Sequence, residues 1–162
     1  MSEANTDIIN LAIRHDGTEV ANSYINMIVE RFSDYFSKIF IVSEDEIEGL
    51  KESEKISVVS FIKPVNNNCQ WLMLLEIGEI PSLQLMQNLK DIVVKAPNET
   101  NILFFPIALC DYNNSEIIDI LEPVGRIYRQ KPTIKNTDME EIILEDFPII
   151  VFRIEESLEI QE

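Results

Sequence analysis

The chain has 162 residues, of which 46% are hydrophobic and 26% are charged, so we expect one globular domain spanning residues 1–162. Its 29 acidic residues outnumber its 13 basic residues and give a formal net charge of −16. This balance argues against a nucleic-acid interface and against docking on anionic lipid, which both need clustered Lys and Arg, and it favours a basic protein partner or mimicry of a polyanion.

The first part of the sequence alternates between apolar runs and short polar segments. "DIINLAIR" (7–14) fits either a strand or a short helix, because periodicity does not distinguish them at this length. After the turn signal "HDG", the segment 18–36 places apolar residues at spacings of three and four, which predicts a helix with Thr18 as its N-cap. "KIFIV" reads as a short buried strand, and Ser43 with Glu46 predicts a brief capped helix after it.

The middle of the chain predicts a β-hairpin. "KISVVSFIKPV" is rich in β-branched residues and predicts a strand that ends near Pro64. "NNN" (66–68) is a turn signal, and "CQWLMLLEIGEI" predicts the next strand. Because two strands joined by a tight turn pair in antiparallel fashion, we expect a sheet that is at least partly antiparallel.

Two further helices and the last strands are predicted downstream. Ser82 opens an amphipathic helix, "SLQLMQNLKDIVVK", and "NILFFPIALCD" predicts a strand with an edge position or a bulge at Pro106. "NNSEIIDILEPVGRIYRQ" predicts a helix that is capped by Asn114 or Ser115 and interrupted at Pro123. "EEIILE" and "FPIIVFRIE" predict the last strands, and the second should be buried or paired because both of its faces are mostly apolar.

This order of elements predicts an α+β or mixed α/β fold, a single compact domain whose partly antiparallel sheet has helices packed on one face. A doubly wound nucleotide-binding fold is not expected, since the four glycines cannot form a G-x-G-x-x-G or P-loop motif. Because no targeting signal or membrane-spanning helix is predicted, we expect a cytoplasmic protein in which the thiols of Cys69 and Cys110 are buried and unreactive.

Few residues suggest catalysis or metal binding. The single histidine, His15, precedes Asp16, and a His–carboxylate pair could act as a general base; we favour a solvated turn, because sequence neighbours rarely point at each other. One His and two distant Cys do not supply a zinc site, and Glu44 and Asp45 belong to a segment, "EDEIE", without the spacing of a calcium loop. We therefore expect no catalytic residue, no cofactor and no bound metal.

One basic cluster, in "GRIYRQKPTIK", could contact an anion such as a phosphate or an acidic peptide. Its four cations are Arg126, Arg129, Lys131 and Lys135. The interpretation we favour places the two arginines on the last turn of the predicted helix, where cations interact favourably with the helix dipole.

Acidic residues are concentrated at the end of the sequence. Residues 138–162, an acidic C-terminal strand region, hold nine acids and one base, so they carry −8 of the net charge of −16. The candidate partner-binding acids are Glu140, Glu141, Glu145, Asp146, Glu155, Glu156 and Glu159. Acids beside a β-prone apolar run also protect against aggregation, which is the interpretation we favour; at a sheet edge, this strand could instead accept a partner strand.

These features lead to one preferred functional hypothesis and three alternatives. The preferred one is a non-enzymatic acidic interaction protein, an inhibitor or adaptor that binds a basic protein partner, in one version as a mimic of the DNA backbone. The abundance of Ile points to an AT-rich genome, and a phage origin fits this version. The alternatives are a small acidic secretion-type chaperone, to which "IGEIPSLQLMQNL" is loosely similar, an enzyme with a site near His15 or Arg126 and Arg129, and a structural subunit with apolar strands such as "ILFFPIALC" as its interface.

Overall fold

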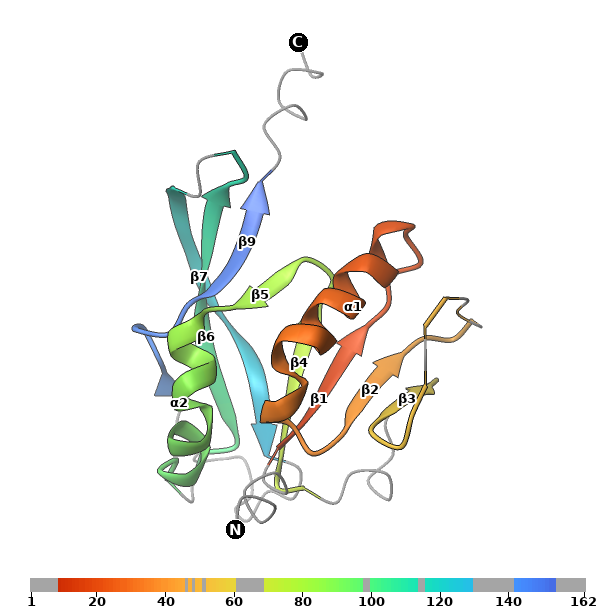
Figure 1. Ribbon diagram of the computed structural model, residues 1–162. Coiled ribbons are helices and arrows are strands. Elements are labelled where there is room, and N and C mark those ends of the chain that lie inside the picture. Colours follow the sequence, from red (N-terminus) through yellow and green to blue (C-terminus); the bar gives the residue numbers. More distant parts are fainter. Residues whose placement is uncertain are drawn as a thin grey trace.

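The computed structural model describes residues 9–45, 47, 49–50, 52–60, 69–97, 100–113, 116–129 and 142–153. Within these residues, nine strands form one mixed sheet and two α-helices lie against it (Figure 1). The elements in chain order are β1 (Ile9–Arg14), α1 (Val20–Phe32), the 3₁₀ turn η2 (Ser33–Tyr35), β2 (Ile39–Val42), β3 (Ile56–Val59), β4 (Trp71–Glu76), β5 (Glu79–Pro81), α2 (Leu83–Val94), β6 (Ile102–Asp111), β7 (Ile117–Arg129), β8 (Ile142–Ile143) and β9 (Ile149–Arg153).

The strand order β3-β2-β1-β4-β7-β6-β9-β5 divides the sheet into two halves, and β8 pairs with β6 outside this path. In the parallel half, β2 and β4 flank β1 and β3 lies outside β2, all in parallel. In the second half, which we call the mixed half, β6 pairs antiparallel with β7 and parallel with β9. The halves meet where three residues of β4 pair antiparallel with Ile127–Arg129 of β7.

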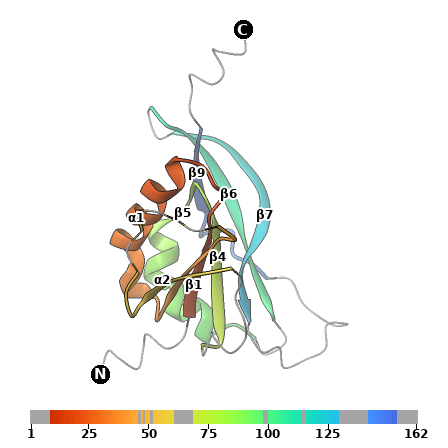
Figure 2. The same ribbon diagram turned by 90° about the vertical axis from the view of Figure 1, so that its right-hand side faces the viewer.

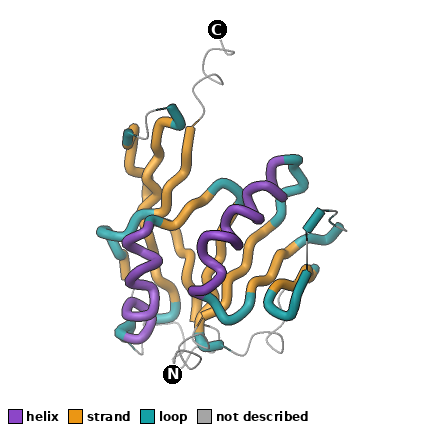
Figure 3. Tube along the Cα trace, viewed as in Figure 1, coloured by secondary structure: helices purple, strands orange, loops and turns teal. Residues whose placement is uncertain are grey.

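Both helices lie on the same face of the sheet, as Figure 2 shows, so the predicted one-sided arrangement of helices is confirmed. Helix α1 crosses the parallel half and α2 crosses the mixed half (Figures 1 and 3). The buried helix residues are Ala21, Tyr24, Ile25, Ile28 and Phe32 of α1 and Leu85, Met86, Leu89 and Val93 of α2. All of them except Ala21 share one hydrophobic cluster with residues from both halves of the sheet, which gives the described elements a common core.

Several local predictions are confirmed. "KIFIV" contains β2, and Ser82 caps α2 by accepting a hydrogen bond from the amide of Leu85 at 3.2 Å. Of the two structures that "DIINLAIR" fits, Ile9–Arg14 form the strand β1. Cys69 and Cys110 are both buried and both free. No helix of the described residues is both long and apolar enough to cross a membrane.

The predicted hairpin is wrong. β3 and β4 are not neighbours, because β2 and β1 lie between them and all four strands are parallel. The predicted second strand of this hairpin is also two elements, β4 and β5, separated by a turn in which Gly78 adopts a φ of +97° that favours glycine. β4 is inserted at the centre of the sheet, where its buried alternate residues Trp71, Met73 and Leu75 reach the core, and local sequence does not encode this choice of neighbour.

The predicted helix over residues 113–130 is also wrong, because Ile117–Arg129 form β7, the longest strand of the described sheet. Its β-branched run suits a strand that pairs with β6. Pro123 is tolerated because the pairing shifts register between Phe105 and Ile107, opposite the β7 segment that contains this proline. Pro106 lies in the same irregularity, so the bulge predicted there is confirmed, although β6 is an interior strand and not an edge.

Two helix starts also differ from expectation. Glu19, and not Thr18, is the N-cap of α1, and its side chain forms no capping hydrogen bond. No helix follows Ser43 in the described residues; instead, the hydroxyl of Ser43 accepts a hydrogen bond from the amide of Asp45 at 3.2 Å. Ser and Asp side chains form such local bonds in turns, and these compete with helix formation.

Candidate functional site

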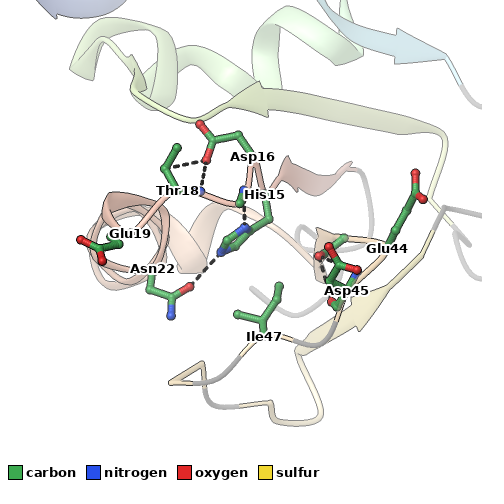
Figure 4. Close-up of a pocket in the computed structure, with 10 residues that line it drawn as sticks. His15, Asp16, Thr18, Glu19, Asn22, Glu44, Asp45 and Ile47 are labelled. Atoms are coloured by element: carbon green, nitrogen blue, oxygen red, sulfur yellow. Dashed lines mark hydrogen bonds between the residues drawn. The ribbon is translucent and has the colours of Figure 1, made fainter.

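A polar cavity lies where β1 and β2 end and α1 begins (Figure 4). Its volume is about 530 Å³. In open sheets with parallel strands, ligands bind outside the carboxyl ends of the strands, which is where this cavity lies. We call it the His15 pocket, and the residues that line it are His15, Asp16, Gly17, Thr18, Glu19, Asn22, Ser43, Glu44, Asp45 and Ile47.

The turn after β1 shapes one wall of the His15 pocket. Gly17 has a φ of +83°, a conformation that other residues rarely adopt, and its amide donates a hydrogen bond to Nδ1 of His15 at 3.0 Å. One carboxylate oxygen of Asp16 accepts hydrogen bonds from the amide of Thr18 at 3.0 Å and from its hydroxyl at 2.6 Å. These two bonds from Thr18 lower the pKa of Asp16 below its ordinary value, so this carboxylate stays charged at neutral pH.

The ring of His15 is held at the centre of the pocket with both nitrogens engaged. Nδ1 accepts from the amide of Gly17, and Nε2 lies 3.0 Å from the amide oxygen of Asn22, to which it donates. This arrangement fits the neutral imidazole with its hydrogen on Nε2. The predicted turn at His15 and Asp16 is confirmed, and the two side chains bond to other residues, as Figure 4 shows.

Such an environment does not favour general-base chemistry at His15. A general base needs a ring nitrogen within hydrogen-bond reach of a substrate proton, and here the acceptor nitrogen already receives a backbone N–H. Cys69 lies elsewhere, where its thiol donates to Oδ1 of Asn10 at 3.4 Å, and Cys110 is buried in β6. Neither thiol lines the pocket as a nucleophile for His15.

Negative charge dominates the His15 pocket. Four carboxylates line it, those of Asp16, Glu19, Glu44 and Asp45, and its described lining contains no Lys or Arg. Figure 4 shows Glu19 and Glu44 on opposite sides of the imidazole of His15. Because like charges around one cleft add their fields, this arrangement attracts a cationic group. No group of three or more His, Cys, Asp or Glu among the described residues is placed to hold a metal ion.

Of the four predicted anion-contacting cations, the structure describes Arg126 and Arg129, and both are engaged within the protein. The guanidinium of Arg126 forms a two-bond ion pair with the carboxylate of Glu79, in which Nε lies 2.8 Å from Oε1, and the pKa of Arg126 is raised chiefly by these bonds. Both side chains are largely buried, at 15% and 10% exposure.

Arg129 lies at the far end of β7 and is also engaged. It donates to the backbone oxygens of Thr100 at 2.9 Å and Pro97 at 3.0 Å, and its guanidinium carbon lies 4.3 Å from the centre of the Trp71 ring. Burial lowers the pKa of Arg129. Lys131 and Lys135 lie outside the described residues. Because β7 is a strand, the expected helix-dipole role of the two arginines is wrong.

Two of the predicted partner-binding acids, Glu145 and Asp146, lie exposed in the turn between β8 and β9 and do not line the His15 pocket. The other five lie outside the described residues: Glu140, Glu141, Glu155, Glu156 and Glu159. The strand they flank, β9, is paired on both sides, with β6 and with β5, so the prediction of a paired strand is confirmed and its alternative as a free edge is wrong.

The gathering of Asp16 and Glu19 with Glu44 and Asp45 was missed from the sequence. Each acidic pair follows an apolar strand, and parallel pairing of β1 with β2 brings the two strand ends together. The sequence signal for this site is the presence of acidic residues directly after each of two apolar runs. It predicts the site only if the two runs are taken to pair as parallel strands. A scan against models of known protein families finds no match, and no curated protein has a matching sequence.

Proposed function

We propose that this protein is a non-enzymatic interaction protein of the cytoplasm that binds a basic protein partner as an inhibitor or adaptor. The observation that carries the proposal is the His15 pocket, where Asp16, Glu19, Glu44 and Asp45 surround one cleft without a Lys or Arg in the described lining. A Lys or Arg side chain of a partner supplies the missing positive charge. The net charge of −16 attracts the same class of partner over longer distances.

The lining of the pocket favours a protein partner over a small-molecule ligand. Small-molecule pockets are lined mainly by apolar and aromatic side chains, whereas Ile47 is the one large apolar side chain in the described lining here. An open polar cleft gives a lone small cation little apolar contact. A cationic side chain on a protein surface adds neighbouring contacts, and these supply the remaining affinity.

Salt dependence separates two forms of this function. A partner recognised through charge, as a mimic of the DNA backbone would be, dissociates steeply as salt rises, because exposed charges are screened within about 10 Å at 0.1 M ionic strength. A chaperone of the secretion type holds an apolar segment and keeps it at high salt. The acidic His15 pocket favours the first form.

The direct test uses a fluorescent peptide of eight lysines and the full chain, with binding followed by anisotropy at about 50 mM and about 300 mM salt. The variant Glu19→Gln/Glu44→Gln/Asp45→Asn removes three charges from the pocket. At roughly 0.5 kcal/mol for each exposed charge, we expect about tenfold weaker binding at low salt. Asp16 is left unchanged because it holds the turn through Thr18.

The matched control is Glu30→Gln/Asp34→Asn/Glu54→Gln, which changes the net charge by the same amount. These three exposed acids lie away from the pocket, near the other end of α1 and before β3. Equal weakening by both triple variants would assign the binding to diffuse charge and would overturn the pocket as the site. Absence of peptide binding at low salt would overturn the proposed function itself.

The acids at the end of the sequence form a second contact in this proposal. Reversal of charge in Glu155→Lys/Glu156→Lys/Glu159→Lys should weaken binding of the same peptide, since residues 138–162 carry −8 of the net charge. If this variant binds the peptide as tightly as the wild type does, the C-terminal acids are not part of the interface, and the His15 pocket is the remaining contact.

A further inference from the structure

The outer side of β7 is open over most of its length. β4 pairs with β7 only at Ile127–Arg129, and within the described part of the chain no strand pairs with the outer side of residues 117–126. β6 occupies the inner side. Figures 1 and 2 show the start of β7 rising with β6 past the ends of the helices, away from β4. Within the described part of the chain, this segment of β7 is therefore a free edge of the sheet, as are the outer sides of β3 and β5.

This edge exposes large apolar side chains. Ile117, Ile118, Ile120 and Leu121 are 61%, 45%, 55% and 41% exposed. Tyr112 and Phe152 are exposed as well, and their rings are in edge-to-face contact at 6.3 Å. Single exposed apolar residues are ordinary, but four within five consecutive residues of one strand mark an interaction surface. We call residues 117–122 the β7 edge.

The backbone of the β7 edge is available for a further strand. The amide of Ile120 donates to its neighbouring side chain, Oδ1 of Asp119, at 2.8 Å. An amide that donates to an exposed side chain does not serve the ladder with β6, so it points to the open side. A partner carbonyl can replace this carboxylate oxygen and release Asp119 for a second contact. Pro123 lacks an amide donor, which limits strand addition to the segment before it.

Charge decides what kind of strand fits. Residues 101–125 contain four acids, Asp111, Glu116, Asp119 and Glu122, and no Lys or Arg. A second copy paired through this edge would place the same acids beside one another, and like charges across neighbouring strands are destabilising. A strand that carries Lys or Arg among apolar residues complements both the carboxylates and the isoleucines.

We propose that the β7 edge binds an extended segment of a basic partner protein by strand addition, with apolar side chains over Ile118 and Ile120 and a Lys or Arg beside Asp119. Ile118 and Ile120 are two residues apart and share one face, while Asp119 lies on the other face. A segment that alternates apolar and basic residues matches this pattern. The inference rests on the proposed function, since it names a surface for the same basic partner.

The test uses three capped fluorescent peptides of about ten residues and the full chain, with affinity measured by anisotropy. In the first peptide Lys alternates with Val, in the second the same lysines and valines form two blocks, and in the third Glu replaces Lys. We expect the alternating Lys peptide to bind about tenfold more tightly than either of the others. Hydrogen exchange should show slower exchange of the amides of Ile118 and Ile120 when this peptide is bound.

Variants locate the binding. Ile118→Ser/Ile120→Ser should weaken the alternating peptide about tenfold, and Asp119→Asn should weaken it about threefold. The control Leu83→Ser/Val94→Ser removes two apolar side chains of similar exposure, 61% and 63%, from the ends of α2 and should change affinity by less than about twofold. All of these sites are exposed, and the thermal melting curve verifies that each variant folds.

The outcomes separate this inference from the proposed function. If the Ile118→Ser/Ile120→Ser variant binds the alternating Lys peptide as tightly as the wild type does, the β7 edge is not its binding site. Binding of the peptide of eight lysines (octalysine) then still supports the proposed function. Equal binding of the Glu and Lys peptides overturns the basic partner at this edge. A sedimentation dimer of the wild-type chain that becomes a monomer in the same variant assigns the edge to a second copy and overturns the inference. If octalysine also fails to bind, the proposed function fails as well.

Discussion

The two halves of the sheet use similar apolar residues in opposite ways. In the parallel half, β1 has five buried residues in succession, and Ile13 is fully inaccessible. In the mixed half, the first six residues of β7 are exposed, although four of them are Ile or Leu. The difference comes from neighbours, because β1 is flanked by strands on both sides and β7 has one neighbour along this segment. An apolar run therefore indicates a tendency to form a strand. The position of that strand in the sheet decides whether its apolar side chains are buried in the core or exposed at an interface.

Glu79 of β5 is central to the polar contacts that join the two halves. Its carboxylate forms the ion pair with Arg126 of β7. The same carboxylate accepts a hydrogen bond from the amide of Glu76, at the end of β4, at 3.0 Å. Its backbone oxygen accepts the hydroxyl of Tyr24 from α1. Together with the short β4–β7 pairing, these contacts link β4, β5, β7 and α1 where the two halves meet.

The largest effect is expected from Arg126→Met. It leaves the carboxylate of Glu79 buried without its ion-pair partner, which costs about 3–5 kcal/mol in the free energy of unfolding. Urea denaturation measures this loss. The double variant Glu79→Gln/Arg126→Met should recover part of it, because no unpaired charge remains buried.

Arg14→Met is the matched control for this prediction. Arg14 also pairs with a glutamate of the same turn region, Glu76, at 3.2 Å, but the two side chains are 59% and 38% exposed. An exposed pair of this kind contributes about 0–1 kcal/mol. Equal losses for Arg126→Met and Arg14→Met would contradict the idea that burial makes Glu79 and Arg126 the link between the halves.

A second prediction compares the halves with one substitution. Ile13→Ala opens a cavity in the buried parallel half and should cost about 2–5 kcal/mol, whereas Ile120→Ala at the β7 edge should change stability by about 0.5 kcal/mol or less. Urea unfolding at two protein concentrations gives both values. A large loss for Ile120→Ala that depends on protein concentration would mean that another molecule buries this edge in solution.

The smallest effect, and the one with a pH signature, concerns Tyr24. Burial raises the pKa of its hydroxyl well above the ordinary value of about 10, so the folded protein holds the proton more tightly than the unfolded chain does. The resulting stability is complete below about pH 10 and falls as the pH rises further, since only the unfolded chain then releases the proton. Tyr24→Phe should cost about 1 kcal/mol at neutral pH through the lost bond to Glu79 and should remove this alkaline decline.

Unfolding in urea between about pH 7 and about pH 11 measures this difference, with Tyr35→Phe as the control. Tyr35 is partly exposed in η2, so its substitution removes a tyrosine hydroxyl from an accessible position. An unchanged alkaline slope in Tyr24→Phe would show that other groups cause the decline. Tyrosinate absorbance adds a direct readout, because the hydroxyl of Tyr24 should lose its proton only on unfolding.

The candidate site was only partly visible in the sequence. The residue types were recognised, since His15 with Asp16 and Glu44 with Asp45 were both considered for chemistry, but as separate segments. Parallel pairing of β1 with β2 brings the two segments together in space. The sequence does not reveal this proximity, because the two segments lie almost thirty residues apart along the chain. Arg126 was expected at the end of a helix. It instead lies in the strand β7, which places its guanidinium beside Glu79 in a buried ion pair.

What the sequence determined by itself was local. The spacing of Leu85, Met86 and Leu89 defines the buried face of α2, Ser82 defines its start, and Pro106 requires an irregular ladder. Tertiary structure alone decided that β4 lies beside β1, that "IIDIL" pairs with β6 as a strand, and that four acidic residues line one pocket. The physical reason is that periodicity and capping depend on neighbours within a few residues, whereas strand partners are selected by the apolar surface that the whole chain can bury.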